Sequence, residues 1–495
     1  MIVRSTAPLE KSQRPSNRTG KAASVVISNV LAERYASAEM ASIFDPETKI
    51  RLERELWVAV LQAQSDLGLT VEPSVIDDYR SVLDNVDVDS IQRRERQTRH
   101  DVKARLDEFN DLAGHQELHK GLTSRDITEN VEQLAIWRAL ALVEGRTLAL
   151  LRLLAERAAE FGSEVIVGRT HNVAAQPTTV GKRFAQIGEE LLAGYESLRA
   201  VQTGFALRGI KGPVGSQQDQ LDLLGTPERV VELEQRVAKH LGISRVLSAV
   251  GQVYPRSRDY AVVAALVQLG AAPANLALMI RLMAGHDLAT EGFRAGQVGS
   301  SAMPHKMNTR SCERINGLHV ILKGHLTMAA GLAGDQWNEG DVSCSVVRRV
   351  VMPDAFFALD GQYETTFAVL SDFGLFPGVS RAELARYLPF LATSALLMHA
   401  VRRGMGREEA HEIIKEHSVA AALRLRQGTG DGTELLRRLG ADQRFPGETS
   451  ELTTIAEQAM TMLGTLDSQI KTFCRNVDQI TLNRPESAYA GSEIV

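Results

Sequence analysis

The sequence contains little cysteine and few aromatic residues. Three cysteines occur in 495 residues, and none of them forms a Cys-x-x-Cys pair: Cys312, Cys344 and Cys474. This spacing argues against a disulfide framework and against a zinc knuckle, and it favours a reducing cytoplasm. Aromatic residues make up 5% of the chain, whereas Ala, Leu, Arg and Glu are abundant, which is typical of a helix-rich protein. We therefore predict an all-α fold.

Long blocks of one charge sign are also absent. The formal net charge is -5 and the pI is near 6.2, so the sequence predicts binding to neither nucleic acid nor an anionic membrane. Residues 1–25 lack the apolar core of a secretory signal, and we interpret them as a disordered extension. The apolar stretch 260–280 is rich in alanine and contains Gln268, Pro273 and Asn275, which favours a helix buried in a bundle over a membrane span.

The length of the chain exceeds what one hydrophobic core usually supports. Apolar residues recur at helical spacing along most of it, and glycine-rich loops interrupt the pattern. We predict an N-terminal helical domain at 26–122, a central bundle of long helices at 123–376 and a C-terminal helical domain at 377–495.

The most informative motif is the segment 299–308, which reads Gly-Ser-Ser-Ala-Met-Pro-His-Lys-Met-Asn and is followed by Glu313. A lysine and an asparagine are suited to bind a carboxylate and to stabilise the charge that builds up on it during a β-elimination. The segment resembles the signature of the fumarase/aspartase superfamily. The resemblance implies that Ser300 is the catalytic base, that Ser301, Lys306 and Glu313 support it, and that Lys306 and Asn308 contact the substrate.

A second motif is the segment 168–179, which begins Gly-Arg-Thr-His and precedes a predicted helix. It resembles a conserved block of the same superfamily. Histidine can protonate a leaving nitrogen near neutral pH, so we assign His171 as the general acid. The alternative is a histidine that only caps a turn before the helix.

Further segments resemble the adenylosuccinate lyase branch of the superfamily, and block 211–215 resembles its actinobacterial members. The resemblance implies that His100 assists His171, and it implies substrate contacts for Arg34, Tyr35, Arg99, His100, Asp101, His119, Thr123, Ser124, Gln252, Arg314, Ser345 and Arg349. Thr123 and Ser124 could instead cap a helix. Two departures from the family pattern are Gly340, where many members have arginine, and Cys344, where many have histidine.

No metal and no cofactor are expected. His115 and His119 stand four residues apart, but no further ligand has suitable spacing. The resemblance implies three helical domains, a homotetramer with a twenty-helix core and active sites shared between subunits. It also implies release of fumarate from two small-molecule purine nucleotides, adenylosuccinate and the succinylated aminoimidazole carboxamide ribotide SAICAR. The alternatives are a carboxymuconate cycloisomerase, an argininosuccinate lyase or a helical scaffold without catalytic activity.

Overall fold

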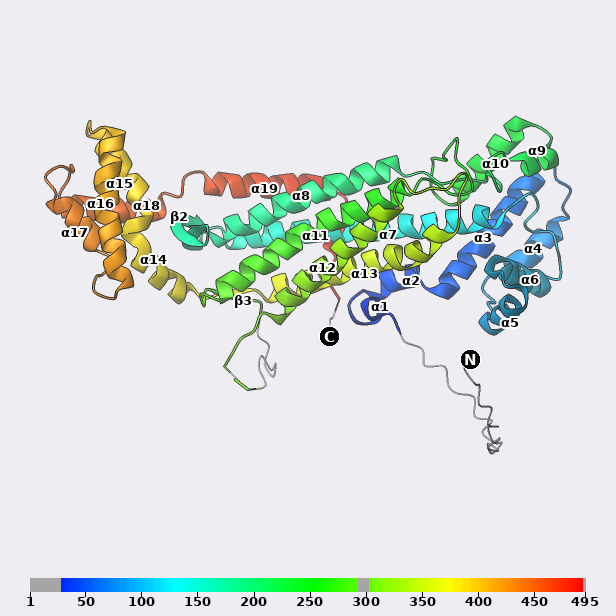
Figure 1. Ribbon diagram of the computed structural model, residues 1–495, viewed down its shortest axis with the longest axis horizontal. Helices are drawn as coiled ribbons and strands as arrows, with labels where there is room; N and C mark the ends of the chain where they lie inside the picture. Colours follow the sequence, from blue (N-terminus) through cyan, green and yellow to red (C-terminus); the bar gives the residue numbers. More distant parts are fainter. Residues whose placement is uncertain (1–27, 293–301, 304, 493–495) are drawn as a thin grey trace, which may run out of the picture.

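Five long helices packed lengthwise form the centre of the molecule in a computed structural model that describes residues 28–292, 302–303 and 305–492 (Figure 1). They are α7 (Ser124–Glu160), α8 (Val180–Gly204), α11 (Ser257–Ala284), α12 (Arg310–Leu332) and α13 (Ser343–Asp372). The 37 residues of α7 correspond to a length of about 55 Å at the usual helical rise. The predicted all-α fold is confirmed, whereas the twenty-helix tetramer core stays a prediction.

The long apolar stretch of the sequence forms most of helix α11. Leu266, Leu269, Leu276 and Ile280 are fully buried in the main hydrophobic cluster, because α8, α12 and α13 surround the helix. By length and composition, α11 and the segment Pro377–Arg402 could each cross a membrane. For α11, burial among the other bundle helices accounts for its composition.

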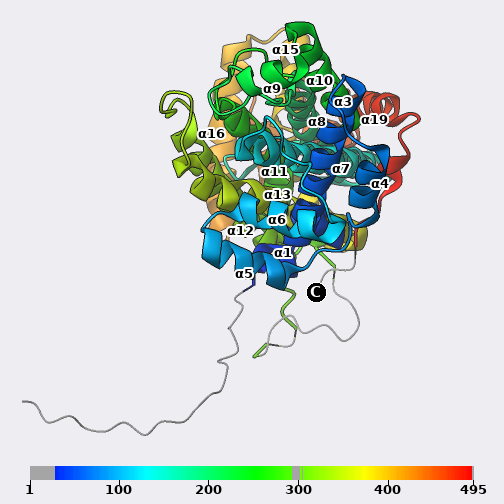
Figure 2. The same cartoon turned by 90° about the vertical axis from the view of Figure 1, so that its right-hand side faces the viewer.

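The right-hand end of the molecule in Figure 1 consists of shorter helices, which Figure 2 shows from the front. They are α3 (Pro46–Asp66), α4 (Pro73–Ser81), α5 (Val88–Thr98), α6 (Asp101–Ala113), α9 (Gln218–Leu224) and α10 (Pro227–His240). The preceding helices α1 (Val30–Arg34) and α2 (Ala38–Ile43) pack instead against α13 of the bundle. A second hydrophobic cluster around Trp57 joins α3, α4 and α6 with α9, α10 and the first part of α7. This end is therefore built from two separate stretches of sequence.

The opposite end carries α14 (Pro377–Leu391), α15 (Thr393–Arg402), α16 (Arg407–Arg426), α17 (Glu434–Ala441) and α18 (Thr449–Thr461) around a cluster of their own. The chain then returns along the bundle as α19 (Leu466–Thr481), and the short 3-10 helix η1 (Pro485–Ala488) follows. Phe473 of α19 is fully buried where α19 packs on α7 and α8. The predicted domain bounds at 122 and 376 stay predictions.

Two short antiparallel two-stranded sheets complete the described fold. Strand β3 (Ala289–Thr290) pairs with β4 (Gly374–Leu375), and β1 (Val165–Thr170) pairs with β2 (Val173–Thr179). The two residues between β1 and β2 are His171 and Asn172, with φ angles of 53° and 60°. Positive φ at both central positions is the requirement of a tight type I′ turn. His171 therefore lies at the tip of a hairpin.

Candidate active site

A cavity of about 430 Å³ lies where α5, α6, α7 and α13 meet. Its lining contains several residues that the sequence predicted to bind substrate: Arg99, His100, Asp101, Ser124, Ser345 and Arg349. They come from three stretches of the sequence, and more than a hundred residues separate the first stretch from the last. The tertiary structure thus brings this part of the predicted set together.

The first group of these residues lies in the turn between α5 and α6. Arg99 has a φ of 51° and ends α5, and His100 begins α6, where its Nδ1 accepts a hydrogen bond from the backbone N–H of Lys103 at 3.2 Å. Asp101 lies 3.2 Å from Arg105 and 3.6 Å from Arg349. Burial acts to raise the pKa of Asp101, but these arginines and a backbone hydrogen bond lower it overall. Asp101 is therefore a carboxylate at neutral pH.

The second group begins α7. Thr123 is the N-cap residue, and its backbone N–H donates to Asp126 at 2.7 Å. Capping is therefore one role of Thr123. Ser124 opens the first turn of the helix, beside the cavity.

Arg125 is a cavity residue that the sequence analysis missed. Its guanidinium donates to the hydroxyl of Ser345 at 2.7 Å and pairs with Glu129 at 3.1 Å. It thereby joins the N-terminus of α7 to that of α13. The only sequence signal was its position directly after Thr123 and Ser124.

Beneath the cavity lies a network of buried ion pairs. Arg256 donates to Glu129 at 2.8 Å, and Arg348 donates to Asp259 at 2.7 Å. Tyr254 donates its hydroxyl to Asp259 at 2.6 Å. Each charged side chain of this network has a charged partner, and the network joins α7, the start of α11 and α13.

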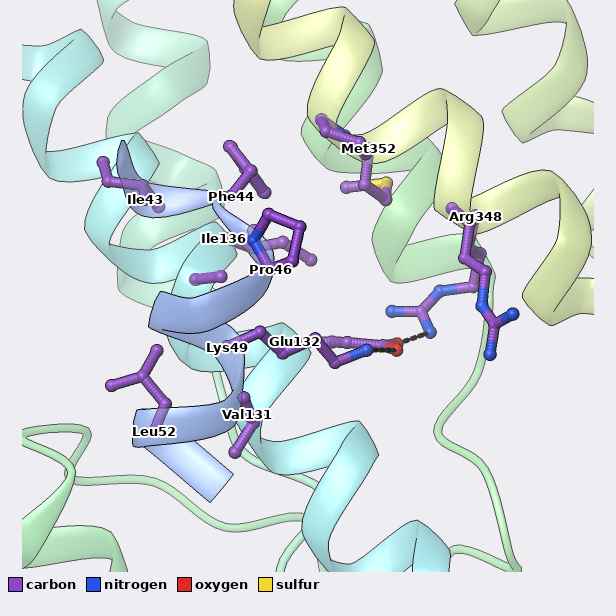
Figure 3. Close-up of a pocket in the computed structure, with 13 residues that line it drawn as sticks. Ile43, Phe44, Pro46, Lys49, Leu52, Val131, Glu132, Ile136, Arg348 and Met352 are labelled. Atoms are coloured by element: carbon purple, nitrogen blue, oxygen red, sulfur yellow. Dashed lines mark hydrogen bonds and ion pairs between the residues drawn. The ribbon is translucent and has the colours of Figure 1, made fainter. Parts of the chain in front are cut away.

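A mostly apolar cavity of about 240 Å³ adjoins the first one and shares Lys49, Glu132 and Arg349 with it. Figure 3 shows Glu132 between Lys49 and Arg348, with Lys49 3.4 Å away and Arg348 in direct contact. Burial acts to raise the pKa of Glu132, but Arg348 and Lys49 lower it overall. Lys49 and Glu132 were also missed by the sequence analysis, since isolated charges on a helix carry no local signal.

His119 and Gln252 are held near the same end by other contacts. The indole N–H of Trp57 donates to Nδ1 of His119 at 3.0 Å. The backbone N–H of Gln252 donates to the carbonyl of Glu339 at 2.8 Å, next to Gly340. Gly340 has a φ of 144°, which L-residues rarely adopt, so an arginine at this position would be strained. The loop conformation therefore accounts for glycine at 340.

His171 lies far from this cavity within the chain. Ser124 begins α7, and the β1–β2 hairpin follows the other end of this helix, about 55 Å away. Figure 1 shows β2 beside α14, at the opposite end of the bundle from α5 and α6. The hairpin is tied to the C-terminal helices by an ion pair between Arg169 and Glu383 and by a 2.8 Å hydrogen bond from Gln176 to Ser394.

A third group lies beside the middle of the bundle. The Arg314 guanidinium of α12 is 5.7 Å from the ring centroid of Tyr35, and Tyr35 packs closely on Gly361 of α13. Arg34 ends α1 next to it, and Glu313 is in the first turn of α12. Twelve residues of α13, or about 18 Å of helix, separate Gly361 from Arg349. Within one chain, Arg314 and Arg349 are therefore not neighbours.

The serine motif is only partly described. Ser300 and Ser301 lie outside the described residues. Lys306 follows shortly after them, and its backbone N–H donates to the carbonyl of Met303 at 3.0 Å. Asn308 lies between Lys306 and the start of α12.

Among the described residues, no group of three or more His, Cys, Asp or Glu side chains could hold a metal ion. His115 instead pairs with Asp78 at 2.8 Å. The same part of the chain contains Cys312, Cys344 and Cys474 as free thiols.

Comparisons with known proteins identify the class of protein as a lyase. A lyase family model matches residues 46–322. The crystal structure of fumarate lyase from Mesorhizobium sp. BNC1 has a TM-score of 0.76 at 19% identity, covering 89% of this chain and 98% of its own. The 3-carboxy-cis,cis-muconate lactonizing enzyme from Pseudomonas putida has a TM-score of 0.78 at 17% identity, covering 91% of this chain and 99% of its own. The fold is thus that of these lyase structures.

The sequence relatives are more specific. A model of the adenylosuccinate lyase C-terminus matches residues 389–473. The adenylosuccinate lyase of Saccharomyces cerevisiae is 32% identical over 474 residues, which are 94% of this chain and 97% of that protein. The adenylosuccinate lyase of Schistosoma mansoni is 32% identical over 451 residues, with coverages of 90% and 93%. The chain belongs to the adenylosuccinate lyase family.

Proposed function

We propose that this protein eliminates fumarate from adenylosuccinate to give AMP, and from SAICAR to give the corresponding aminoimidazole carboxamide ribotide, in the cytoplasm and without a cofactor. The observation that carries this proposal is the similarity to adenylosuccinate lyases along nearly the whole chain. The cavity with Arg99, Arg125 and Arg349 supports it, because arginine side chains suit the phosphate and carboxylate groups of these substrates.

In the proposed reaction, Ser300 removes a proton from the carbon next to a succinyl carboxylate. The electron pair moves onto that carboxylate, where Lys306 and Asn308 stabilise the negative charge. The electron pair then returns from the carboxylate to form the carbon–carbon double bond of fumarate as the carbon–nitrogen bond breaks. The electron pair of the broken bond stays on nitrogen, which receives a proton from His171. One proton leaves the substrate and one is returned, so the elimination involves no net oxidation or reduction.

The remaining predicted residues bind and orient the substrate in this proposal. Five of them line the cavity between α5, α6, α7 and α13: Arg99, Asp101, Ser124, Ser345 and Arg349. His119 and Thr123 precede Ser124 in the chain. Gln252 contacts the substrate from the loop beside Gly340, and His100 assists His171. Arg34, Tyr35 and Arg314 come from the group beside the middle of the bundle.

Each active site is assembled from different subunits of a homotetramer in this proposal. The separation of about 55 Å between Ser124 and the hairpin of His171 supports it, since one chain alone does not bring these side chains together. Large apolar side chains are also exposed along the bundle on α11, α12 and α13: Leu278, Leu282, Val320, Ile321, Met328, Val346 and Val350. Exposed apolar surface of this kind favours subunit contacts.

The activity is tested by incubating the purified protein with adenylosuccinate and measuring AMP and fumarate. Argininosuccinate and 3-carboxymuconate are assayed in parallel. We expect AMP and fumarate in equal amounts from adenylosuccinate only. Turnover of a phosphate-free substrate alone would contradict the proposed activity, and absence of turnover with every substrate would favour a scaffold.

Subunit sharing is tested by mixing inactive variants. His171→Ala and Ser300→Ala are each expected to abolish turnover and to leave the tetramer intact. If the two residues of one site come from different chains, random exchange in an equal mixture restores about a quarter of the sites. The control is a mixture of His171→Ala with His171→Gln, which restores none. Failure to recover activity after verified exchange would contradict sharing.

A further inference from the structure

Trp57 makes a side-chain contact that the proposed mechanism does not use. It lies in α3 with only 1% of its surface exposed, and its indole N–H donates to Nδ1 of His119 at 3.0 Å. The two rings are 6.1 Å apart at an angle of 72°. An indole N–H can only donate, so Nδ1 of His119 must accept.

This hydrogen bond determines which form of the imidazole fits the structure. An imidazolium carries a hydrogen on both ring nitrogens, and so its Nδ1 cannot accept. The same holds for the neutral tautomer with its hydrogen on Nδ1. Only the neutral ring with its hydrogen on Nε2 keeps the contact with Trp57.

The surroundings of His119 also favour the neutral ring over the imidazolium. Burial lowers its pKa, and His100 and Lys103 lower it further, whereas Asp126 acts in the opposite direction.

Asp126 of α7 is already neutralised by another cation. Its Oδ1 accepts from Arg208 at 2.5 Å and from the backbone N–H groups of Lys211 and Gly212 at 2.8 and 3.0 Å. Its other oxygen accepts from Thr123. Asp126, the carboxylate that acts on the pKa of His119, is therefore already paired with the guanidinium of Arg208.

We propose that Trp57 is a positioning residue that holds His119 as a neutral Nε2–H donor for a carboxylate or phosphate oxygen of the substrate. This inference rests on the proposed function, in which His119 contacts the substrate. A neutral donor adds a hydrogen bond without adding a cation beside His100 and Lys103, and it does not compete with His171 as a proton donor.

The test compares Trp57→Phe with Trp137→Phe in the full-length protein. Both remove an indole N–H, and both side chains belong to or pack against the same hydrophobic cluster, but only Trp57 contacts His119. Solid-state 15N spectra of sedimented, 15N-histidine-labelled protein report the tautomer and charge of each ring, and the signals that disappear in His119→Gln belong to His119. Steady-state kinetics with adenylosuccinate are measured in parallel.

We expect His119 of the wild type and of Trp137→Phe to show the neutral Nε2–H form from pH 6 to 8. In Trp57→Phe its titration midpoint moves to higher pH, because Nδ1 is free to bind a proton. KM for adenylosuccinate rises roughly three- to tenfold, the equivalent of one lost hydrogen bond, with a smaller change in kcat. Should Trp57→Phe fail to fold, His119→Gln retains a neutral donor and is expected to keep a KM below that of His119→Ala.

An imidazolium or an Nδ1–H tautomer at pH 7 in the wild type would overturn the inference. Equal KM values for Trp57→Phe and Trp137→Phe, or for His119→Gln and His119→Ala, would overturn the role toward substrate. If the wild type converts no substrate, the proposed function fails, and the spectra still decide whether Trp57 sets the tautomer.

Discussion

Asp360 of α13 is a buried carboxyl group that ties the N-terminal segment to the bundle. Only 1% of its surface is exposed, and it accepts a hydrogen bond from the backbone N–H of Ser37 at 2.6 Å. Ser37 caps α2 two residues after Tyr35. Burial raises the pKa of Asp360 from 3.8 to about 6, and the nearby Glu364 acts in the same direction, whereas the hydrogen bonds from Ser37 oppose it. The folded protein therefore disfavours the carboxylate form.

The pKa difference predicts how stability depends on pH. Because the pKa is raised on folding, the contribution of Asp360 is fully present below about pH 4 and is lost as the pH rises through 6. The change from 3.8 to about 6 corresponds to about 3 kcal/mol above pH 7. Asp360→Asn keeps an oxygen for Ser37 and cannot ionise. We expect this variant to be about 3 kcal/mol more stable than the wild type at pH 8 and about half as much at pH 5.

Differential scanning calorimetry at one protein concentration measures the effect. Unfolding entropy of about 2.1 cal/mol/K per residue gives about 1 kcal/mol/K for 495 residues, so Tm should rise by about 3 °C at pH 8. The control is Asp354→Asn on the same helix, where the carboxylate binds Asn29 at the surface at 2.6 Å. A Tm difference for Asp360→Asn that is the same at both pH values, or a lower Tm at pH 8, would refute the reasoning.

Two further predictions concern the cavity and the packing of α19. Arg125→Met removes a cationic side chain that reaches the cavity residue Ser345 at 2.7 Å. If Arg125 binds a phosphate or carboxylate of the substrate as proposed, one charged hydrogen bond is lost and kcat/KM for adenylosuccinate should fall about tenfold or more, mainly through KM. An unchanged KM in steady-state assays would contradict this. Gly188→Ala places a Cβ 2.0 Å from the ring of Phe473 and should destabilise the fold by about 1–3 kcal/mol in calorimetry. The control is Gly204→Ala at the end of the same helix, where a Cβ meets nothing within 4 Å and no loss of stability is expected. Equal Tm values for the two variants would argue against tight packing of α19.

The sequence predicted the fold class and the long helices because both follow from local patterns. Apolar spacing marked the bundle, and the alanine-rich composition of α11 indicated a buried helix, as the packing around Leu269 and Ile280 confirms. The resemblance of short motifs to a known family supplied the candidate residues, including those that line the cavity between α5, α6, α7 and α13. Their catalytic and binding roles stay proposals.

Contacts between distant stretches were beyond the reach of local patterns. Arg125 reaches Ser345 across 220 positions, and Trp57 reaches His119 across 62. Neither pair has a spacing that helical periodicity can detect, because the contacts arise only when separate segments of the chain pack together.

The sequence by itself determined that this chain forms long helices and contains the residue types of an elimination site. Only the tertiary structure decided where those residues lie: the α5–α6 turn and His171 are at opposite ends of α7. The physical reason is that the helical backbone is rigid and extends with each residue. Residues close in a motif stay close, whereas the distance between motifs depends on the length and packing of the helices that join them.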